Sequence, residues 1–542
     1  MNRIILLVLI ACFAYCKVSA QCTEPPVPRV LLVGDSWAFF MNTESTINYA
    51  LTRGGHSNYT FVSNSNLSVN GAKTDNVMSS ATETEIRNQL NQHPSIDFVH
   101  LSIGGNDFLG GWDTSMTQAQ TDTLMTNVFV KLDSVIRFIK SVRPGIKILW
   151  SGYCFTNFKE SITTSVAPTS HPFYSTWQGM KFPDFYQINR VQNQISQRFR
   201  AYSDTTPNIY FVEATGLMQH VYGQPSPMSV PPTGTYAPLT SPIDTGFTDY
   251  PSPLVSMRNY GIFKDCYHLS TDGYRYLLGY HTQKYYQKAM MDDLYLLSDS
   301  NQTGSVSAQG AVSNTLLMGQ AGADTFSTVL SFNTTAMMDT TLSKASIFLK
   351  RLNLTGGNPI SNNLQVKMKS GNFGTSANIE AADYTAAADA TGTPCQFGSS
   401  AGDGDWIRLD LPASMLSHIN HTAPTQFIIS APGVSASRAT FYNSSDPDFA
   451  PIMNMKYGQA PNAIREISAD HFSVYPNPSS GSLTIEGSEA ITKVEVTNLL
   501  GETVLHPQMQ QNTISISTLA SGMYILNITT KSGIASQKVI KD

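Results

Sequence analysis

The stretch that decides the fold is Leu31-Leu32-Val33-Gly34-Asp35-Ser36-Trp37, an apolar run that ends in a glycine turn. Further apolar runs follow at residues 98–103, 146–150 and 209–212, with helix-compatible stretches at 117–141 and 183–201. Short runs of mainly apolar residues, without a regular polar alternation, predict strands buried on both faces, as in a parallel sheet covered by helices. We therefore expect an α/β fold, a three-layer α/β/α sandwich closed by one long helix at 271–297.

The chain has 542 residues, too many for one compact core. After about residue 300 it becomes rich in Asn, Thr, Ser, Gly and Ala, and short alternating segments predict strands at 345–349, 364–368, 406–411 and 427–429. Further alternating segments follow at 483–485, 494–496 and 524–528. We expect a signal peptide at 1–20, the α/β domain at 21–299, a β-sandwich at 300–460 and a small Ig-like all-β module at 461–542.

The first twenty residues have the pattern of a cleaved signal peptide, with Arg3 before an apolar run at 4–14 and Val-Ser-Ala at 18–20. That run is short for a transmembrane helix, and no later segment offers about twenty uninterrupted apolar residues. We expect an exported chain with no transmembrane segment. A lipoprotein is the alternative, although Tyr15 and Gln21 fit poorly before a lipidated Cys16 or Cys22.

Charge is sparse, since the net charge is −5 and 13% of the residues are charged, with no block of Lys and Arg. A nucleic-acid partner is therefore not expected. A neutral or weakly charged ligand fits the composition better.

Three motifs follow strands of the predicted sheet or precede its last helix. Ser36 ends the first strand, where a serine hydroxyl can attack a carbonyl if a base takes its proton, although a helix N-cap serine looks the same. Gly104-Gly105-Asn106-Asp107 ends another strand, where the Asn106 amide can donate to an oxyanion and the glycines let the backbone, Gly105 included, turn beside a substrate. The same sequence is also an ordinary turn.

The third motif is Asp265-Cys266-Tyr267-His268. A carboxylate three residues before an imidazole can accept the Nδ1 proton and leave Nε2 facing a serine. Such a pair could also begin a metal site, but no further His, Asp or Glu has ligand spacing around it, so we do not expect a metal. Acyl transfer through a serine requires no organic cofactor, and we expect none.

Together the motifs resemble the SGNH, or GDSL, hydrolase superfamily. The resemblance implies that Ser36 is the nucleophile, His268 the base and Asp265 its orienting carboxylate. It also implies an oxyanion hole made by the Ser36 N–H, Gly71 and Asn106. Trp37 stands where the family name has Leu.

Removal of the signal peptide leaves Cys22, Cys154, Cys266 and Cys395, which permit three disulfide pairings or four buried thiols. Cys154 follows one strand and Cys266 lies in the histidine loop. We therefore predict a disulfide between these two.

The alternation of strands and helices is interrupted by two long segments, at 154–182 and 214–264. Each begins at the end of a predicted strand, and in open α/β sheets ligands bind at the carboxyl ends of the strands. Tyr236, Phe247 and Tyr250 of the second are predicted substrate contacts; a surface loop with no such role is the alternative.

The last segment resembles the type A sorting domain of the type IX secretion system, through Tyr475-Pro476-Asn477-Pro478, Gly481, Leu-Leu-Gly at 499–501, Gly522-Met523-Tyr524 and the closing 538–541. The resemblance implies a partner, the type IX secretion machinery, and a location at the cell surface or outside the cell. The middle region resembles the DNRLRE β-sandwiches more loosely, through Trp406-Ile407-Arg408-Leu409 and Ser-Ala-Ser-Arg-Ala at 435–439, which implies either a carbohydrate-binding module or a spacer.

The sequence thus predicts a secreted serine carboxylic ester hydrolase, with an acylated polysaccharide as the expected substrate. A lipase or lysophospholipase with the same triad is one alternative. A non-catalytic glycan-binding surface protein is the other.

Overall fold

The computed structural model describes residues 22–222, 252–458 and 472–542, apart from residues 23, 339, 362–363, 399–401, 420, 434–435, 488–490, 499–502, 506, 508, 510 and 531–533. The predicted signal peptide lies outside the described residues, as do Tyr236, Phe247 and Tyr250. In the part of the chain that is described, none of the helices is both long and apolar enough to cross a lipid bilayer.

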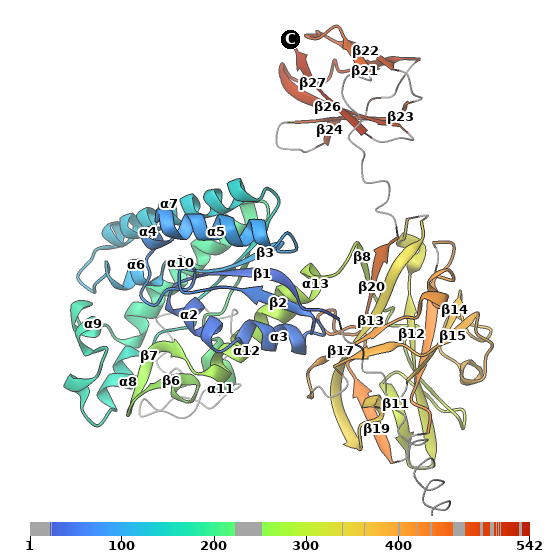
Figure 1. Ribbon diagram of the computed structural model, residues 1–542, viewed down its shortest axis with the longest axis horizontal. Helices are drawn as coiled ribbons and strands as arrows, with labels where there is room; N and C mark the ends of the chain where they lie inside the picture. The colour runs from blue at the N-terminus through green and yellow to red at the C-terminus, as the bar shows by residue number, and fades with distance from the viewer. Residues whose placement is uncertain are drawn as a thin grey trace, which may run out of the picture.

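The N-terminal domain is built on a parallel sheet of five strands in the order β2-β1-β3-β4-β5 (Figure 1). The strands are β1 Val27–Gly34, β2 Tyr59–Val62, β3 Phe98–Ser102, β4 Lys147–Ser151 and β5 Ile209–Val212. The main helices are α2 Ser36–Thr43, α3 Thr46–Arg53, α5 Ser80–Gln92, α7 Gln118–Val142, α10 Phe185–Thr205 and α12 Thr271–His281. Short helices α4 Thr74–Val77, α6 Gly105–Leu109, α8 Phe158–Thr163, α9 Tyr174–Gly179 and α11 Leu217–Tyr222 fill the connections.

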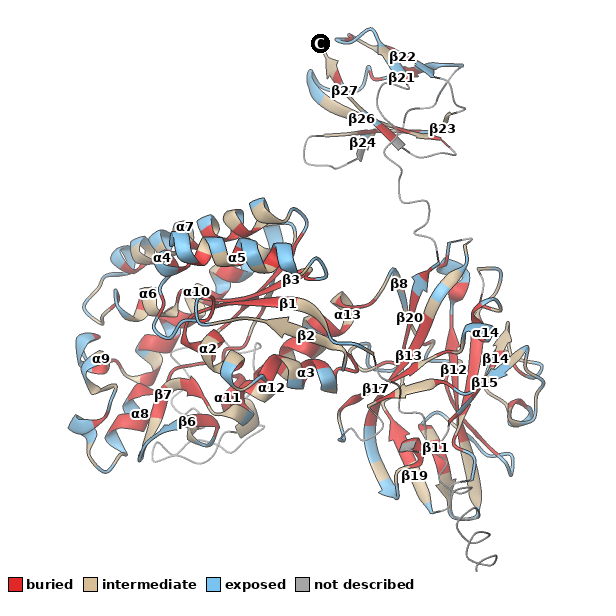
Figure 2. Cartoon of the chain, viewed as in Figure 1, coloured by how far each residue is buried: buried red, intermediate tan, exposed pale blue. Residues whose placement is uncertain are grey.

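Both faces of this sheet are covered, as the continuous apolar strands require. Val30 and Leu32 of β1 pack in one cluster with α2, α3 and α12, whereas Leu31 and Val33 pack in another with α5 and α7. Figure 2 shows the buried residues in red along the strands between these two layers of helices. The predicted three-layer α/β/α sandwich is confirmed.

The predicted long helix at 271–297 is wrong in its last part. After α12 the chain forms a short π-helix, Thr282–Tyr286, and one more α-helical turn, α13 Gln287–Ala289. Leu294–Leu297 is strand β8, which pairs with β20, Ile452–Tyr457. Leu-Tyr-Leu-Leu fits a helix and a strand equally well, so a partner strand far along the chain decides its conformation.

The middle region is a sandwich of antiparallel sheets around one large apolar core. Its strands are β9 Gly304–Ser307, β10 Val312–Ser313, β11 Leu316–Ala321, β12 Asp324–Phe332, β13 Leu342–Gly356, β14 Gln365–Ser370, β15 Ala390–Gly392, β16 Cys395–Phe397, β17 Trp406–Asp410, β18 Thr425–Ser430, β19 Ser437–Phe441 and β20. The long strand β13 pairs with β17 and β20 in its first half and with β19 in its second, across a bulge at 351–353, so it belongs to both sheets. Trp406 and Arg408 are each only 3% exposed.

The C-terminal module has its own apolar core between two small sheets. One contains β21 Phe472–Tyr475, β22 Ser482–Gly487 and β25 Thr513–Ser515. The other contains β23 Ile491–Thr497, β24 Thr503–Leu505, β26 Gly522–Thr530 and β27 Ile534–Lys541.

The α/β domain and the sandwich are joined by more than the connecting chain. A disulfide links Cys22 to Cys395 of β16. Glu24 pairs with Lys344 at 2.9 Å and with Arg408 at 2.6 Å. The sandwich therefore contacts the segment that leads into β1.

The predicted disulfide between Cys154 and Cys266 is wrong, because both are free and buried. Cys154 packs in the cluster of α2 and α12, whereas Cys266 packs in a separate cluster with Phe158 and Ile162 of α8. The two thiols therefore belong to different parts of the domain core.

Candidate active site

Ser36 is held at the carboxyl end of β1 by a close contact between strands. A Cβ on Gly34 would lie 1.9 Å from the carbonyl oxygen of Ser102 at the end of β3, so only glycine fits there. The next residue, Asp35, donates its N–H to the same carbonyl at 2.8 Å, and its carboxylate caps α2 by accepting the Trp37 N–H at 2.9 Å. Ser36 thus begins α2, where backbone N–H groups have no acceptor within the helix.

The histidine and aspartate of the third motif complete a chain of hydrogen bonds to this serine. His268 Nε2 lies 2.8 Å from Ser36 Oγ, and His268 Nδ1 lies 2.8 Å from Asp265 Oδ2. With Nδ1 protonated, the imidazole donates to the carboxylate and its Nε2 accepts the serine hydroxyl. The other oxygen of Asp265 accepts the N–H groups of Tyr267 and His268, both at 3.0 Å, so the loop itself fixes the carboxylate.

All three side chains are buried, which shields the chain of hydrogen bonds from water. Ser36, Asp265 and His268 are 4%, 1% and 6% exposed. Aromatic rings pack on the imidazole, with the Phe40 centroid 5.0 Å and the Tyr267 centroid 4.3 Å away. Packing and hydrogen bonds together hold the His268 imidazole in one orientation.

The loop after Leu67 carries Gly71 and is tied to α6. Gly71 has a φ of 78°, in the left-handed region that favours glycine. The Asn106 amide donates to the carbonyl of Ala72 at 3.0 Å. Its neighbour Asp107 accepts the N–H of Thr74 at 2.9 Å and the Thr74 hydroxyl at 2.7 Å. The two motifs are therefore held together by side chains of the Gly-Gly-Asn-Asp turn.

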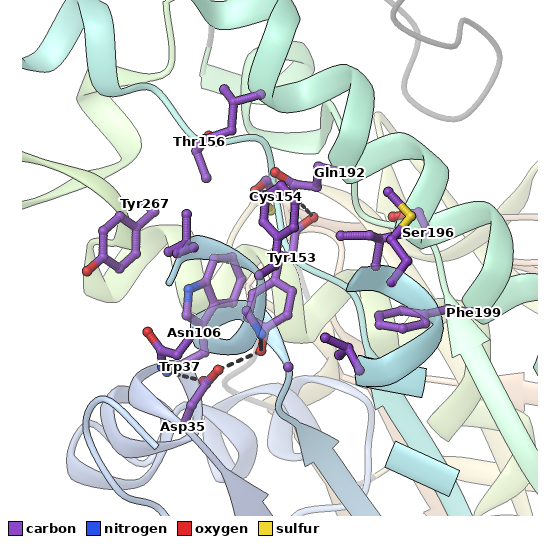
Figure 3. Close-up of a pocket in the computed structure, with 18 of the residues that line it drawn as sticks. Asp35, Trp37, Asn106, Tyr153, Cys154, Thr156, Gln192, Ser196, Phe199 and Tyr267 are labelled. Atoms are coloured by element: carbon purple, nitrogen blue, oxygen red, sulfur yellow. Dashed lines mark hydrogen bonds between the residues drawn. The ribbon is translucent and has the colours of Figure 1, made fainter. Parts of the chain in front are cut away.

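A second polar network, which no sequence motif predicted, involves Asp35, the residue before the serine, and Figure 3 shows its bond from Tyr153 to Asp35. Tyr153 donates its hydroxyl to Asp35 Oδ2 at 2.6 Å and accepts the Gly105 N–H at 3.2 Å. It connects the turn that carries Ser36 to the turn that carries Asn106. Burial raises the pKa of Asp35 from 3.8 to about 6, against the lowering effect of the Tyr153 hydrogen bond. One weak indication of this network was present in the sequence, namely that Tyr153 lies two residues beyond the end of β4.

A mostly apolar cavity of about 70 Å³ lies beside Ser36 and Asn106. Figure 3 shows it between Trp37 and Asn106 on one side and Ser196 and Phe199 of α10 on the other. Gly105 is part of its wall, and the apolar side chains that line it include Phe108, Leu124, Met125, Val128, Phe129, Ile188, Ile195 and Phe199. The cavity is therefore suited to a small apolar group attached to a carbonyl at Ser36.

The other reactive side chains near the site are poor nucleophiles. Burial raises the pKa of the Cys154 thiol and of the Cys266 thiol, which disfavours the thiolate in both. Within the described ranges, no three His, Cys, Asp or Glu side chains are grouped as a metal site would require.

Two family models match the sequence. Residues 32–276 match the GDSL-like lipase/acylhydrolase family, and residues 473–542 match the secretion system C-terminal sorting domain. No curated protein matches the chain.

Solved structures similar to this chain cover about half of it. A carbohydrate esterase of family 3 from Talaromyces cellulolyticus is 13% identical, covers 49% of this chain and 98% of its own, and has a TM-score of 0.28. A family 3 carbohydrate esterase from Clostridium thermocellum is 18% identical, with 49% and 98% covered and a TM-score of 0.26. A putative platelet activating factor from Streptococcus pneumonia is 15% identical, with 50% and 86% covered and a TM-score of 0.27.

Proposed function

We propose that the chain hydrolyses esters of short carboxylic acids with Ser36 as nucleophile, on the premise that residues 32–276, which match the GDSL-like lipase/acylhydrolase family, are a domain of that family. The enzyme class is that of an SGNH-type serine esterase. Residues 473–542 form a secretion sorting domain, which indicates type IX secretion to the cell surface or outside the cell. The observation that carries the proposal is the chain of two 2.8 Å contacts from Ser36 through His268 to Asp265.

The reaction begins when Ser36 Oγ attacks the ester carbonyl and His268 Nε2 takes its proton. The imidazolium that forms is stabilised by Asp265, which accepts the Nδ1 proton in a hydrogen bond but does not itself become protonated. The tetrahedral oxyanion accepts hydrogen bonds from the Ser36 N–H, the Gly71 N–H and the second N–H of the Asn106 amide, the first being engaged by Ala72.

His268 then donates its proton to the departing alkoxide, and the acyl group stays on Ser36. A water molecule that gives its proton to the same Nε2 attacks the acyl-enzyme, and collapse of the second tetrahedral intermediate returns the Ser36 hydroxyl and releases the acid. Every proton transfer uses one nitrogen, so the fixed orientation of the imidazole serves both halves of the reaction.

The size of the cavity supports a short acyl group. Its volume of about 70 Å³ is roughly half of the ~150 Å³ that encloses a benzene molecule. An acetyl methyl group fits this volume, and the chain of a long fatty acid does not. The cavity therefore favours acetyl esters over the lipase alternative.

We propose that the alcohol of the substrate ester is a hydroxyl group of a polysaccharide. A β-sandwich fixed to the esterase domain by a disulfide and ion pairs gives an exported enzyme a second surface on the same polymer, which raises the effective concentration of substrate. The proposal includes the predicted domain limits, in which the sandwich spans residues 300–460. It also includes Tyr236 and Tyr250 as residues that contact the substrate.

The test is release of acetate from acetylated xylan and from acetylated pectin by the mature chain, compared with hydrolysis of p-nitrophenyl acetate, butyrate and palmitate. We expect acetate release and a steep fall in kcat/KM from acetate to palmitate. Ser36→Ala should lower kcat by about 10⁴-fold or more, whereas Ser134→Ala, at an exposed serine of α7, should leave it unchanged. Cleavage of palmitate alone would move the assignment to a lipase. Absence of any Ser36-dependent ester cleavage would leave the non-catalytic binding protein.

A further inference from the structure

A second, larger cleft lies where the α/β domain meets the β-sandwich. Its volume is about 490 Å³, within the range of small-molecule sites in proteins. One wall is formed by α3 and by one face of α12, the other by β13, β17 and the Tyr442 loop. Figure 1 shows α3 and α12 on the side of the α/β domain that faces the sandwich. This interdomain cleft shares no lining residue with the cavity beside Ser36.

The sandwich wall contributes a lysine without a hydrogen-bond acceptor. Lys350 is only 8% exposed, and its ammonium contacts the rings of Phe449, Tyr442 and Trp406, at 3.8, 5.6 and 5.9 Å from their centroids. No hydrogen bond or ion pair joins its Nζ to another described residue. A buried ammonium stabilised by ring faces alone still has three N–H groups to satisfy.

The other cationic side chains of the cleft are already neutralised by ion pairs. Arg53 pairs with Asp405 across the domain boundary, and Arg275 pairs with Asp272 at 3.2 Å along α12. Within the described lining, Lys350 is therefore the cation that makes no ion pair. Burial lowers its pKa to about 8, opposed by Asp405, Asp446 and Asp448, so it is mostly charged at pH 7. An anionic group in the cleft would supply the missing acceptor.

The wall of the α/β domain is rich in tyrosine. Its exposed or half-buried members are Tyr49, Tyr222, Tyr276 and Tyr280, of which Tyr276 is 42% exposed. A tyrosine presents an apolar ring face and a polar hydroxyl at its edge. That combination suits a ligand that itself has C–H faces and a periphery of hydroxyl groups, which is the chemistry of a saccharide.

We infer that the interdomain cleft binds a carboxylate-bearing segment of a polysaccharide, with the carboxylate on Lys350 and sugar rings against the tyrosines of α3 and α12. The inference deepens the proposed function but rests on a separate set of side chains. Helix α12 begins three residues after His268, and together with the π-helix that continues it lines the cleft from Asp272 to Gln283. A polymer held in the cleft is thereby kept near the esterase site.

The experiment is calorimetric titration of the full mature chain carrying Ser36→Ala, so that no ester is turned over. The probes are an oligogalacturonate, a neutral xylo-oligosaccharide of similar length, and polyglutamate. We expect saturable binding of the oligogalacturonate alone. Lys350→Met, which keeps the aliphatic stem, should weaken it at least ~10-fold, and Tyr276→Ala by about 2- to 10-fold. Lys456→Met, at an exposed lysine of β20, is the matched control and should bind as tightly as the parent.

Three results would overturn the inference. The first is no saturable binding of the oligogalacturonate, and the second is equal binding of either other probe, which would assign the cleft to neutral glycans or to acidic peptides. The third is unchanged affinity in the Tyr276 variant together with unchanged affinity in a folded Lys350 variant. Because binding is measured in Ser36→Ala, failure of the proposed ester hydrolysis leaves this result unaffected.

Discussion

Replacing Asp265 by Asn tests the role of the carboxylate without changing its shape. In the wild type, one oxygen of Asp265 accepts two backbone N–H groups at 3.0 Å and the other accepts His268 Nδ1 at 2.8 Å. The backbone N–H groups require an acceptor, so the carbonyl oxygen of the introduced amide would take that place. The NH₂ group of the amide would then face Nδ1.

Two donors cannot face each other, so the imidazole would move its proton from Nδ1 to Nε2. Nε2 would then be unable to accept the proton of Ser36, which lies 2.8 Å away. The wrong tautomer in a serine triad lowers kcat by about 10⁴-fold, equivalent to about 5.5 kcal/mol in the activation free energy. KM should change little, because Asp265 is 1% exposed and does not reach the substrate.

The assay is steady-state hydrolysis of p-nitrophenyl acetate, with thermal unfolding followed in parallel. Asp204→Asn, at an exposed aspartate of α10, is the matched control and should retain wild-type kinetics. A loss of less than about 10-fold in a folded Asp265→Asn variant would refute the reasoning, since it would mean that the tautomer is set by something other than Asp265.

Three further predictions follow from the same geometry. Asn106→Ala removes an oxyanion donor and should lower kcat for p-nitrophenyl acetate by about 10²- to 10³-fold with little change in KM; an equal loss in KM would show a role in ground-state binding instead. The pKa of Asp35 is raised from 3.8 to about 6, so the folded protein binds the proton of this carboxyl more tightly than the unfolded chain does. As pH rises from about 4 to about 6, the free energy of unfolding of the wild type should therefore fall relative to that of Asp35→Asn, by about 3 kcal/mol in all. Urea unfolding of both proteins at pH 4 and pH 7 measures this change, and a constant difference would contradict it. Leu124→Ala enlarges the cavity beside Ser36 and should raise kcat/KM for butyrate relative to acetate by at least ~10-fold; an unchanged ratio would place the acyl group elsewhere.

The disulfide between Cys22 and Cys395 gives the two-domain arrangement a physical basis. It closes a long loop, and cross-links of long loops remove much entropy from the unfolded chain. Because the interdomain cleft depends on both walls, a fixed arrangement of the domains also preserves its lining. The disulfide thus helps to keep the two walls of the interdomain cleft together, although each wall belongs to a different domain.

The sequence by itself determined the architecture of the first domain, because the relevant signals are local. Continuous apolar runs such as Val30 to Val33 predict doubly covered strands, and glycine turns after them mark the edge where side chains of different strands meet. It also indicated Ser36, Asn106, Asp265 and His268 as residues that such an edge would gather. The hydrogen bonds of the site show that the turns do approach one another, since Asn106 bonds to the loop that carries Gly71 and His268 bonds to Ser36. Figure 3 shows Asp35 and Asn106 on the same side of the cavity.

Only the tertiary structure decided features that depend on partners far apart in sequence. Leu294–Leu297 became a strand because β20 pairs with it, Cys22 met Cys395 across 373 positions, and Cys154 and Cys266 were drawn into separate cores. A local pattern fixes what a segment can do, whereas the free energy of burial and pairing depends on which segments become neighbours, and that information is distributed over the whole chain.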